Sequence, residues 1–96
     1  MHAVIRKYAG AQGVVNEARG RLGHLEQTMR GTPGFVAYYF LETADGVATI
    51  TITEDEAGTT ESMGRASTWV QQNLEARDQL GSPEVTTGQV LLSATR

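Results

Sequence analysis

The chain has 96 residues, no cysteine and a formal net charge of −3, from 8 Lys and Arg against 11 Asp and Glu. The length suits one small domain spanning residues 1–96, and the lack of cysteine excludes disulfides, zinc–thiolate sites and a cysteine nucleophile. No basic cluster favours nucleic acid, and no apolar run reaches the roughly 20 residues of a membrane span. No signal peptide opens the chain either, so we expect a cytoplasmic protein with neither nucleic acid nor membrane as its partner.

The first two predicted elements are a strand and a helix. Residues 2–8 are rich in β-formers and predict a strand. From Gly13 the hydrophobic period changes to steps of 3 and 4, which predicts one helix with a single apolar stripe. The stripe consists of Val14, Ala18, Leu22, Leu25 and Met29. Gly31 and Pro33 are typical of a helix end, so we expect the helix to stop there.

The next two predicted elements form an antiparallel hairpin. Residues 35–43 are the most apolar stretch, and residues 47–53 alternate strictly between polar and apolar. Asp45-Gly46 between them is a typical hairpin turn. Alternation along the first strand places Phe35, Ala37, Tyr39 and Leu41 on one face, and Val36, Tyr38 and Phe40 on the other.

A second helix and a last strand complete the chain. Thr53-Glu54-Asp55-Glu56 has the spacing of a capping box, which predicts a helix that continues to about Ala76. Its apolar stripe consists of Met63, Ala66, Val70 and Leu74. Gly81-Ser82-Pro83 interrupts the chain, and residues 86–93 predict the last strand.

The order β-α-β-β-α-β predicts an α+β, ferredoxin-like fold, with two helices on one face of an antiparallel sheet. The other face of such a sheet normally meets water and is polar. Here neither face of the strand at residues 35–43 is polar. We therefore expect a homodimer in which two copies pack sheet to sheet.

Several short motifs resemble a known family. They are Pro33-Gly34-Phe35, the hairpin 35–53, Ser67-Thr68-Trp69-Val70-Gln71 with Leu74, and a final strand preceded by Pro83. In this order they resemble the dimeric α/β-barrel superfamily, and within it the antibiotic-biosynthesis-monooxygenase-like family. The resemblance covers essentially the whole chain. It implies a homodimeric α/β barrel with a pocket for a small aromatic or planar molecule between sheet and helices.

The resemblance also implies a type of chemistry. Oxygenases of this family use neither flavin nor metal: the substrate loses a proton, and the electron-rich anion reacts directly with dioxygen. In the haem-degrading branch, the resemblance implies an asparagine on the first strand, a tryptophan on the second helix and a histidine about ten residues after that tryptophan. This chain has Trp69, but Arg6 and Lys7 stand on the first strand and Gln79 stands ten residues after Trp69. We therefore expect no haem and no other cofactor.

Four aromatic residues are candidate ligand contacts. Trp69 falls about one position, or 100°, to the side of the apolar stripe, so its ring should edge the space between helix and sheet. The alternative is a tryptophan that only fills the core. Tyr38 and Tyr39 point to opposite faces, so at most one of them faces the helix-side pocket. Tyr8 could hydrogen-bond a ligand if its strand face points inward.

Two further residues are weak catalytic candidates. Arg6 shares a strand face with Tyr8 and could stabilise an anion, or it could pair with a carboxylate at the sheet edge. His24 could act as a general base near neutral pH, or it could be a solvated residue on the flank of its helix. No His, Asp and Glu cluster has metal-ligand spacing, so we expect no metal site.

Two functions remain open at this point. One is a cofactor-independent monooxygenase, hence an oxidoreductase, acting on a small aromatic molecule. The other is a non-catalytic homodimer that binds a small ligand or serves a structural role. The sequence leaves open whether the protein is an enzyme.

Overall fold

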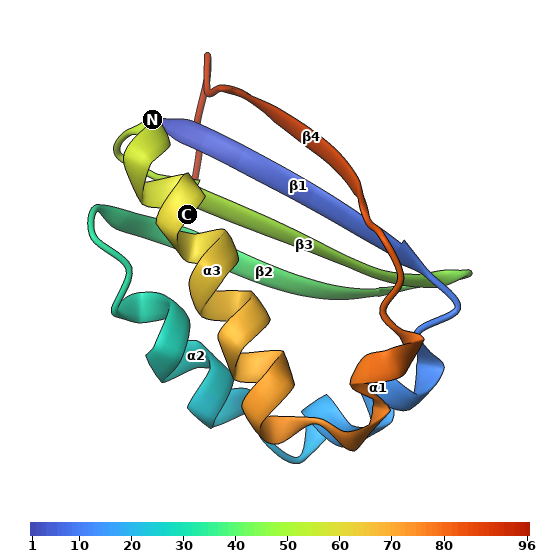
Figure 1. Cartoon of the computed structure of the whole chain (residues 1–96). Helices are drawn as coiled ribbons and strands as arrows, with labels where there is room; N and C mark the ends of the chain where they lie inside the picture. The colour runs from blue at the N-terminus through green and yellow to red at the C-terminus, as the bar shows by residue number, and fades with distance from the viewer.

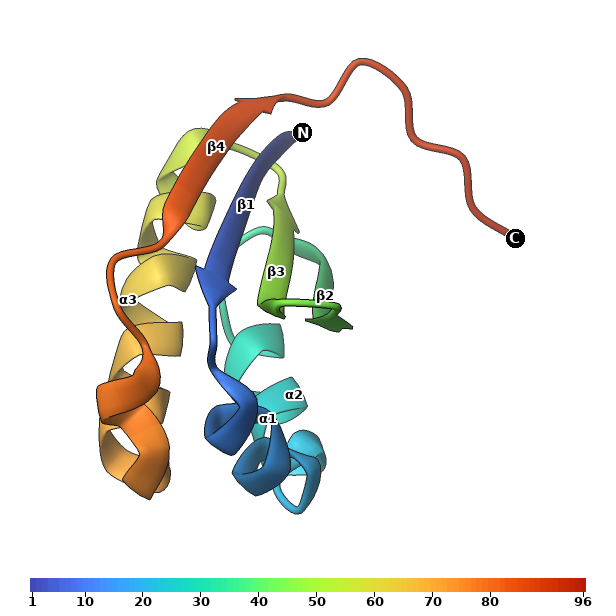
Figure 2. The same cartoon turned by 90° about the vertical axis from the view of Figure 1, so that its right-hand side faces the viewer.

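The computed structural model describes residues 1–96. The chain forms one four-stranded sheet with helices packed on it (Figure 1). Its elements are β1 (His2–Ala9), α1 (Gln12–Arg19), α2 (Leu22–Arg30), β2 (Phe35–Thr43), β3 (Gly46–Thr53), α3 (Glu56–Asn73), the 3-10 helix η1 (Glu75–Gln79) and β4 (Glu84–Gln89). The sheet is antiparallel with strand order β2-β3-β1-β4. Figures 1 and 2 show the helices on one face of this sheet, which confirms the predicted α+β, ferredoxin-like fold.

The predicted first helix is in fact two helices. α1 ends at Arg19 with Gly20 as its C-cap, and Arg21 leaves the helical conformation with φ −131° and ψ 17° before α2 begins. Glycine weakens a helix interior by about 1 kcal/mol relative to alanine, so the chain breaks there at little cost. The break lets α1 pack against η1 and α2 pack against α3 and β2. Leu22, predicted in the buried stripe, is consequently exposed.

A β-bulge changes which way the start of β2 faces. Phe35 pairs with Thr53 and Ala37 pairs with Ile52, so one extra residue lies between them on β2. A bulge reverses the alternation of side chains on one side of it. Phe35 therefore packs against the core with Tyr38 and Phe40, whereas simple alternation predicts it on the face of Tyr39.

The helix α3 is shorter than predicted and is rotated about its axis. Asp55, rather than Thr53 of the predicted capping box, is the N-cap: it accepts a hydrogen bond from the Gly58 backbone N–H at 3.0 Å, and the helix begins at Glu56. It ends at Asn73 rather than near Ala76. Its buried side chains are Thr59, Ser62, Ala66 and Trp69. Trp69 is only 3% exposed and belongs to the core cluster between α3 and the sheet.

The last strand begins two residues earlier than predicted, at Glu84 instead of residue 86. β4 spans Glu84–Gln89 and pairs only with β1, as an edge strand. The following residues leave the sheet on the side away from the helices (Figure 2). Leu91 and Leu92, predicted within the strand, are 95% and 86% exposed there. No helix in the chain is both long and apolar enough to cross a bilayer.

Candidate functional site

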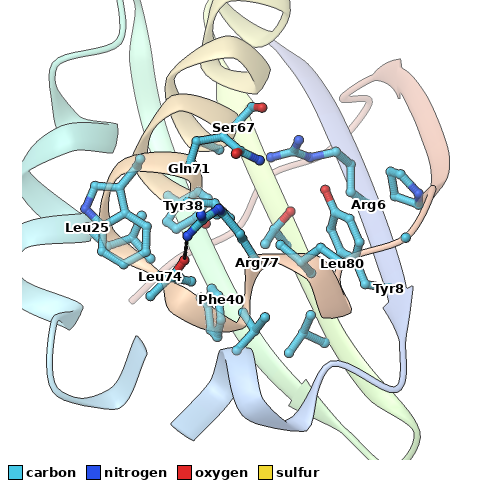
Figure 3. A pocket seen from close by; sticks show the side chains of 18 residues that line it. Arg6, Tyr8, Leu25, Tyr38, Phe40, Ser67, Gln71, Leu74, Arg77 and Leu80 are labelled. Atoms are coloured by element: carbon cyan, nitrogen blue, oxygen red, sulfur yellow. Dashed lines mark hydrogen bonds between the residues drawn. The ribbon is translucent and has the colours of Figure 1, made fainter. Parts of the chain in front are cut away.

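A cavity of about 330 Å³ lies between the helix-covered face of the sheet, α3 and the segment that follows α3 (Figure 3). Eighteen residues line it, of which 11 are hydrophobic. They are Arg6, Tyr8, Val14, Leu25, Tyr38, Phe40, Val47, Thr49, Ala66, Ser67, Trp69, Val70, Gln71, Leu74, Arg77, Leu80, Gly81 and Pro83. No aspartate, glutamate or histidine is among them, so the charged groups of this cavity are arginines.

Strand register brings part of this lining together. Arg6 lies opposite Thr49, Tyr8 lies opposite Val47, and Phe40 lies opposite Thr49 on its other side. Residues opposite one another in an antiparallel sheet point to the same face. Arg6 and Tyr8 of β1 thus line the same cavity as Tyr38 of β2 and Trp69 of α3, and all four are sequence candidates. Tyr39 points to the open face of the sheet, where it is 52% exposed.

Arg6 is the most unusual residue of the cavity. It is only 8% exposed, on a central strand, and it forms none of the ion pairs of the chain. Its Nε is buried without a hydrogen-bond partner, as is the Thr49 Oγ1 opposite it. Buried cations are normally paired because losing their hydration is costly. The expected pairing of Arg6 with a carboxylate at the sheet edge is absent, and a bound anion would compensate the charge.

Tyr38 contributes a hydrogen-bond donor to the same cavity. Burial raises the pKa of its phenol to about 12, an effect that the positive charge of Arg6 partly offsets and that Tyr8 reinforces. At neutral pH the phenol therefore keeps its proton. It can donate a hydrogen bond to an anion, but it is a poor acceptor for a substrate proton.

His24 lies outside the cavity. It is exposed on α2 and lines a separate polar groove between α2 and α3. Its Nδ1 accepts a hydrogen bond from the Trp69 Nε1–H at 3.0 Å. The indole thus lines the cavity while its N–H points to the groove. The structure brings His24 into contact with the candidate Trp69 but not into the cavity lining, so it offers no geometric support for a general-base role.

The mouth of the cavity is formed by η1 and the residues that follow it. The Glu17 carboxylate on α1 accepts hydrogen bonds from the backbone N–H groups of Glu75 and Ala76, at 2.8 and 2.6 Å. The Gly13 backbone N–H donates to the Gln79 Oε1 at 2.8 Å. These contacts fix η1 against α1 and position Arg77 at the cavity.

Sequence reasoning missed Arg77, Gln71 and Leu80. Gln71 follows Ser67 by four residues, which places both on one side of the helix, beside the partly buried Val70. That spacing was the available signal. Arg77 had none, because its place depends on the Glu17 contacts with η1.

Comparison of the fold with solved structures gives close matches. The monooxygenase from the gene ActVA-Orf6 of Streptomyces coelicolor, solved with nanaomycin D, is 21% identical over 96% of this chain and 91% of its own, with a TM-score of 0.57. SnoaB, a cofactor-independent oxygenase from Streptomyces nogalater, is 14% identical over 99% and 96%, with a TM-score of 0.60. The chain has the antibiotic-biosynthesis-monooxygenase-like fold.

The same fold extends to a protein that holds a porphyrin. An MhuD variant, solved with two manganese protoporphyrin IX molecules per active site, is 14% identical over 99% of this chain and 98% of its own, with a TM-score of 0.67. In this chain no histidine lines the cavity to ligate a haem iron. No group of three or more His, Cys, Asp or Glu side chains gathers elsewhere.

At the level of sequence there is no match, either to a protein-family model or to a curated protein. The antibiotic-biosynthesis-monooxygenase-like fold is thus shared without close sequence similarity. Because one fold serves many activities, function has to be argued from the cavity itself.

Proposed function

We propose that this protein binds a small aromatic molecule with an acidic hydroxyl group in the cavity, and oxidises it with dioxygen without a cofactor. The observation that carries the proposal is Arg6: a buried side chain that forms no ion pair and whose Nε has no hydrogen-bond partner, in the wall of a mainly apolar cavity. Such a site favours a ligand that is apolar over most of its surface and anionic at one point.

The shape and lining of the cavity support an aromatic ligand. About 330 Å³ is within the range of small-molecule sites and suits two or three fused rings. Tyr8, Tyr38, Phe40 and Trp69 offer ring faces and edges for stacking. Half of the remaining lining is aliphatic.

The charges support stabilisation of an anion. A guanidinium in a low-dielectric cavity lowers the pKa of a bound phenol or enol, because the charged form is attracted to it. Tyr38, which stays protonated, can donate a second hydrogen bond to the same oxygen. Since no histidine or carboxylate lines the cavity, the proton leaves to water. This favours substrates that are already acidic.

For an anthrone-type substrate the reaction balances without a further reductant. The ring CH2 loses a proton to give the enolate, whose carbon transfers electrons to dioxygen and forms a C–O bond. The resulting hydroperoxide loses water and leaves a carbonyl, so CH2 and O2 become C=O and H2O. The neighbours described as a monooxygenase and a cofactor-independent oxygenase support this reaction class.

One observation favours a second function, ligand binding without catalysis. The cavity offers no side chain suited to accept the substrate proton. If uncatalysed proton loss to water is too slow, the same cavity still holds an aromatic anion.

Oxygen uptake and calorimetry with 1,8-dihydroxyanthrone test the proposal. We expect one O2 consumed per anthrone, faster than without protein, and at least a tenfold lower kcat/KM for Arg6→Gln. Arg21→Gln, at the exposed turn between α1 and α2, is the matched control and should match the wild type. Binding without oxygen uptake would support the non-catalytic alternative. If the protein neither binds nor oxidises the anthrone, the proposal is wrong.

We also propose that the open face of the sheet pairs with the same face of a second copy. That face has half-buried and exposed apolar side chains, namely Ala3, Ile5, Ala37, Tyr39, Leu41, Ile50 and Ile52. The C-terminal segment with Leu91 and Leu92 extends to the same side of the sheet (Figure 2). A second copy that covered the open face and the C-terminal segment would remove this apolar surface from water.

A further inference from the structure

We infer that His24 is a positioning residue for the cavity, although it lies outside the cavity lining. Its neutral imidazole holds the Trp69 indole in the cavity wall, and protonation of the imidazole releases the ring. This part of the inference concerns the protein without a ligand. Its consequence, weaker binding in the cavity at acid pH, rests on the proposed function.

Trp69 is placed to connect two separate hollows of the molecule. It is the one residue that lines both the cavity and the polar groove between α2 and α3. The two helices, which carry the two partners of the hydrogen bond, lie side by side on the sheet (Figure 1). A group in the groove that moves the indole therefore changes the wall of the cavity.

The hydrogen bond from the Trp69 Nε1–H to the His24 Nδ1, at 3.0 Å, determines the state of the imidazole. The indole nitrogen is a donor only, so the Nδ1 has to be the acceptor. The imidazole is then neutral and carries its proton on Nε2. A protonated imidazole has an N–H on both nitrogens, so it directs a donor at the indole donor and the hydrogen bond is lost.

Protonation also places a positive charge on the unfavourable side of the indole. The negative potential of an aromatic ring lies over its faces, whereas its edge is positive. His24 meets the indole at its N–H edge, with the ring centroids 6.2 Å apart and the ring planes tilted by 47°. The cation is therefore repelled, and the indole N–H regains a partner only by turning toward water in the groove.

The other charges of the groove offset each other. Glu61 and Arg65 face it from α3, and they form an ion pair at 3.5 Å. Apart from His24, α2 contributes no charged or titratable residue to the groove, and β2, which also packs against α2, contributes none. His24 is therefore the group of the groove whose charge changes between about pH 5 and 8.

NMR spectroscopy of the protein without a ligand tests the positioning role, because Trp69 is the only tryptophan and gives a single indole N–H signal. From about pH 8 to 5.5 we expect this signal to move upfield and to exchange faster with water, along the titration curve of the His24 imidazole. His24→Gln offers an amide oxygen that does not titrate, so its indole signal should stay near the position seen at high pH. His2→Gln, which removes the only other histidine, is the matched control and should titrate like the wild type.

Calorimetry with 1,8-dihydroxyanthrone under nitrogen tests the consequence for the cavity. The ratio of wild-type affinity to His24→Gln affinity should fall about threefold from pH 8 to pH 5.5, since one hydrogen bond is lost. Using this ratio removes the effect of pH on the anthrone itself. His24→Lys places a cationic donor beside the indole, so it should show the weaker binding at both pH values.

The outcomes separate the inference from the proposed function. An indole signal that does not titrate in the wild type, or that titrates equally in His24→Gln, would overturn the positioning role. If the signal titrates but the affinity ratio stays constant, the ring moves without controlling the cavity, and the inference is wrong while the proposed function stands. If the wild type does not bind the anthrone at pH 8, the proposed function is wrong, and the NMR titration still decides the role of His24. The backbone spectrum of each variant establishes that it is folded.

Discussion

At the scale of single residues, Tyr38 makes the stability of the protein depend on pH in alkali. Its folded pKa of about 12 lies above the value near 10 expected in the unfolded chain. The folded state therefore holds the proton more tightly, and this stabilisation is complete below pH 10 and lost as pH rises through 12. Over that range we expect the wild type to lose roughly 2 to 3 kcal/mol relative to Tyr38→Phe.

Urea unfolding between pH 8 and the highest pH at which the protein stays folded measures this difference. Tyr39→Phe is the matched control, because Tyr39 is exposed on the open face of the sheet. The unfolding free energy of Tyr39→Phe should change with pH in the same way as that of the wild type. Parallel curves for Tyr38→Phe and the wild type would contradict the prediction.

A second residue-scale prediction concerns the hydrogen bond from Trp69 to His24. His24→Ala leaves the buried indole N–H without its acceptor, which we expect to cost about 1 to 3 kcal/mol of unfolding free energy. His24→Gln retains an acceptor and should lose less. Because Trp69 is the only tryptophan, its fluorescence reports both unfolding and any change around the ring. Equal stability of the Ala and Gln variants would show that the lost stability does not come from the hydrogen bond.

At the scale of elements, η1 depends on one side chain of another helix. Glu17 accepts two backbone N–H groups at the start of η1, so Glu17→Ala should loosen the mouth of the cavity while the sheet stays intact. We expect faster hydrogen exchange at residues 75–80 and unchanged exchange in β1 and β3. Asn16→Ala, an exposed neighbour on α1, is the control. Unchanged exchange in η1 would mean that other contacts hold it.

The sequence predicts element types well and element ends less well. The order of strands and helices follows from hydrophobic periodicity, which the structure confirms. The break at Gly20 could not be predicted, because the apolar stripe continues through it and only packing of α1 against η1 favours the interruption. The bulge after Phe35 depends on pairing with β3, and local alternation gives no sign of it.

The candidate site shows the same division between local and long-range information. Period-2 alternation was enough to place Arg6 and Tyr8 on one face of β1. The predicted stripe through Val70 places Trp69 to one side of it, whereas the buried face of α3 runs through Ser62, Ala66 and Trp69 itself. Arg77 enters the site only through contacts with α1, which join residues far apart in the chain.

At the scale of the whole molecule, the core lies on one side of the sheet only. The buried cluster fills the space between the sheet and the helices. The opposite face carries Ile5, Ile50 and Tyr39 in register across three strands. A small domain gains stability by covering such a face, and a standard interface buries roughly 800 Å² per partner. A pair of copies meeting through this face would also cover the C-terminal leucines.

Sedimentation equilibrium tests this assembly. We expect the wild type to show twice the chain mass of 10.3 kDa, and Ile50→Glu to shift it to the monomer because a charge would be buried at the centre of the interface. Gln72→Glu adds the same charge on the exposed side of α3 and should remain dimeric. Replacing Leu91 and Leu92 by serine should weaken association without affecting the fold of the sheet, since both lie beyond β4. A wild-type mass of one chain at every concentration would refute the dimer. In that case the apolar open face would have to be tolerated in water by the isolated chain.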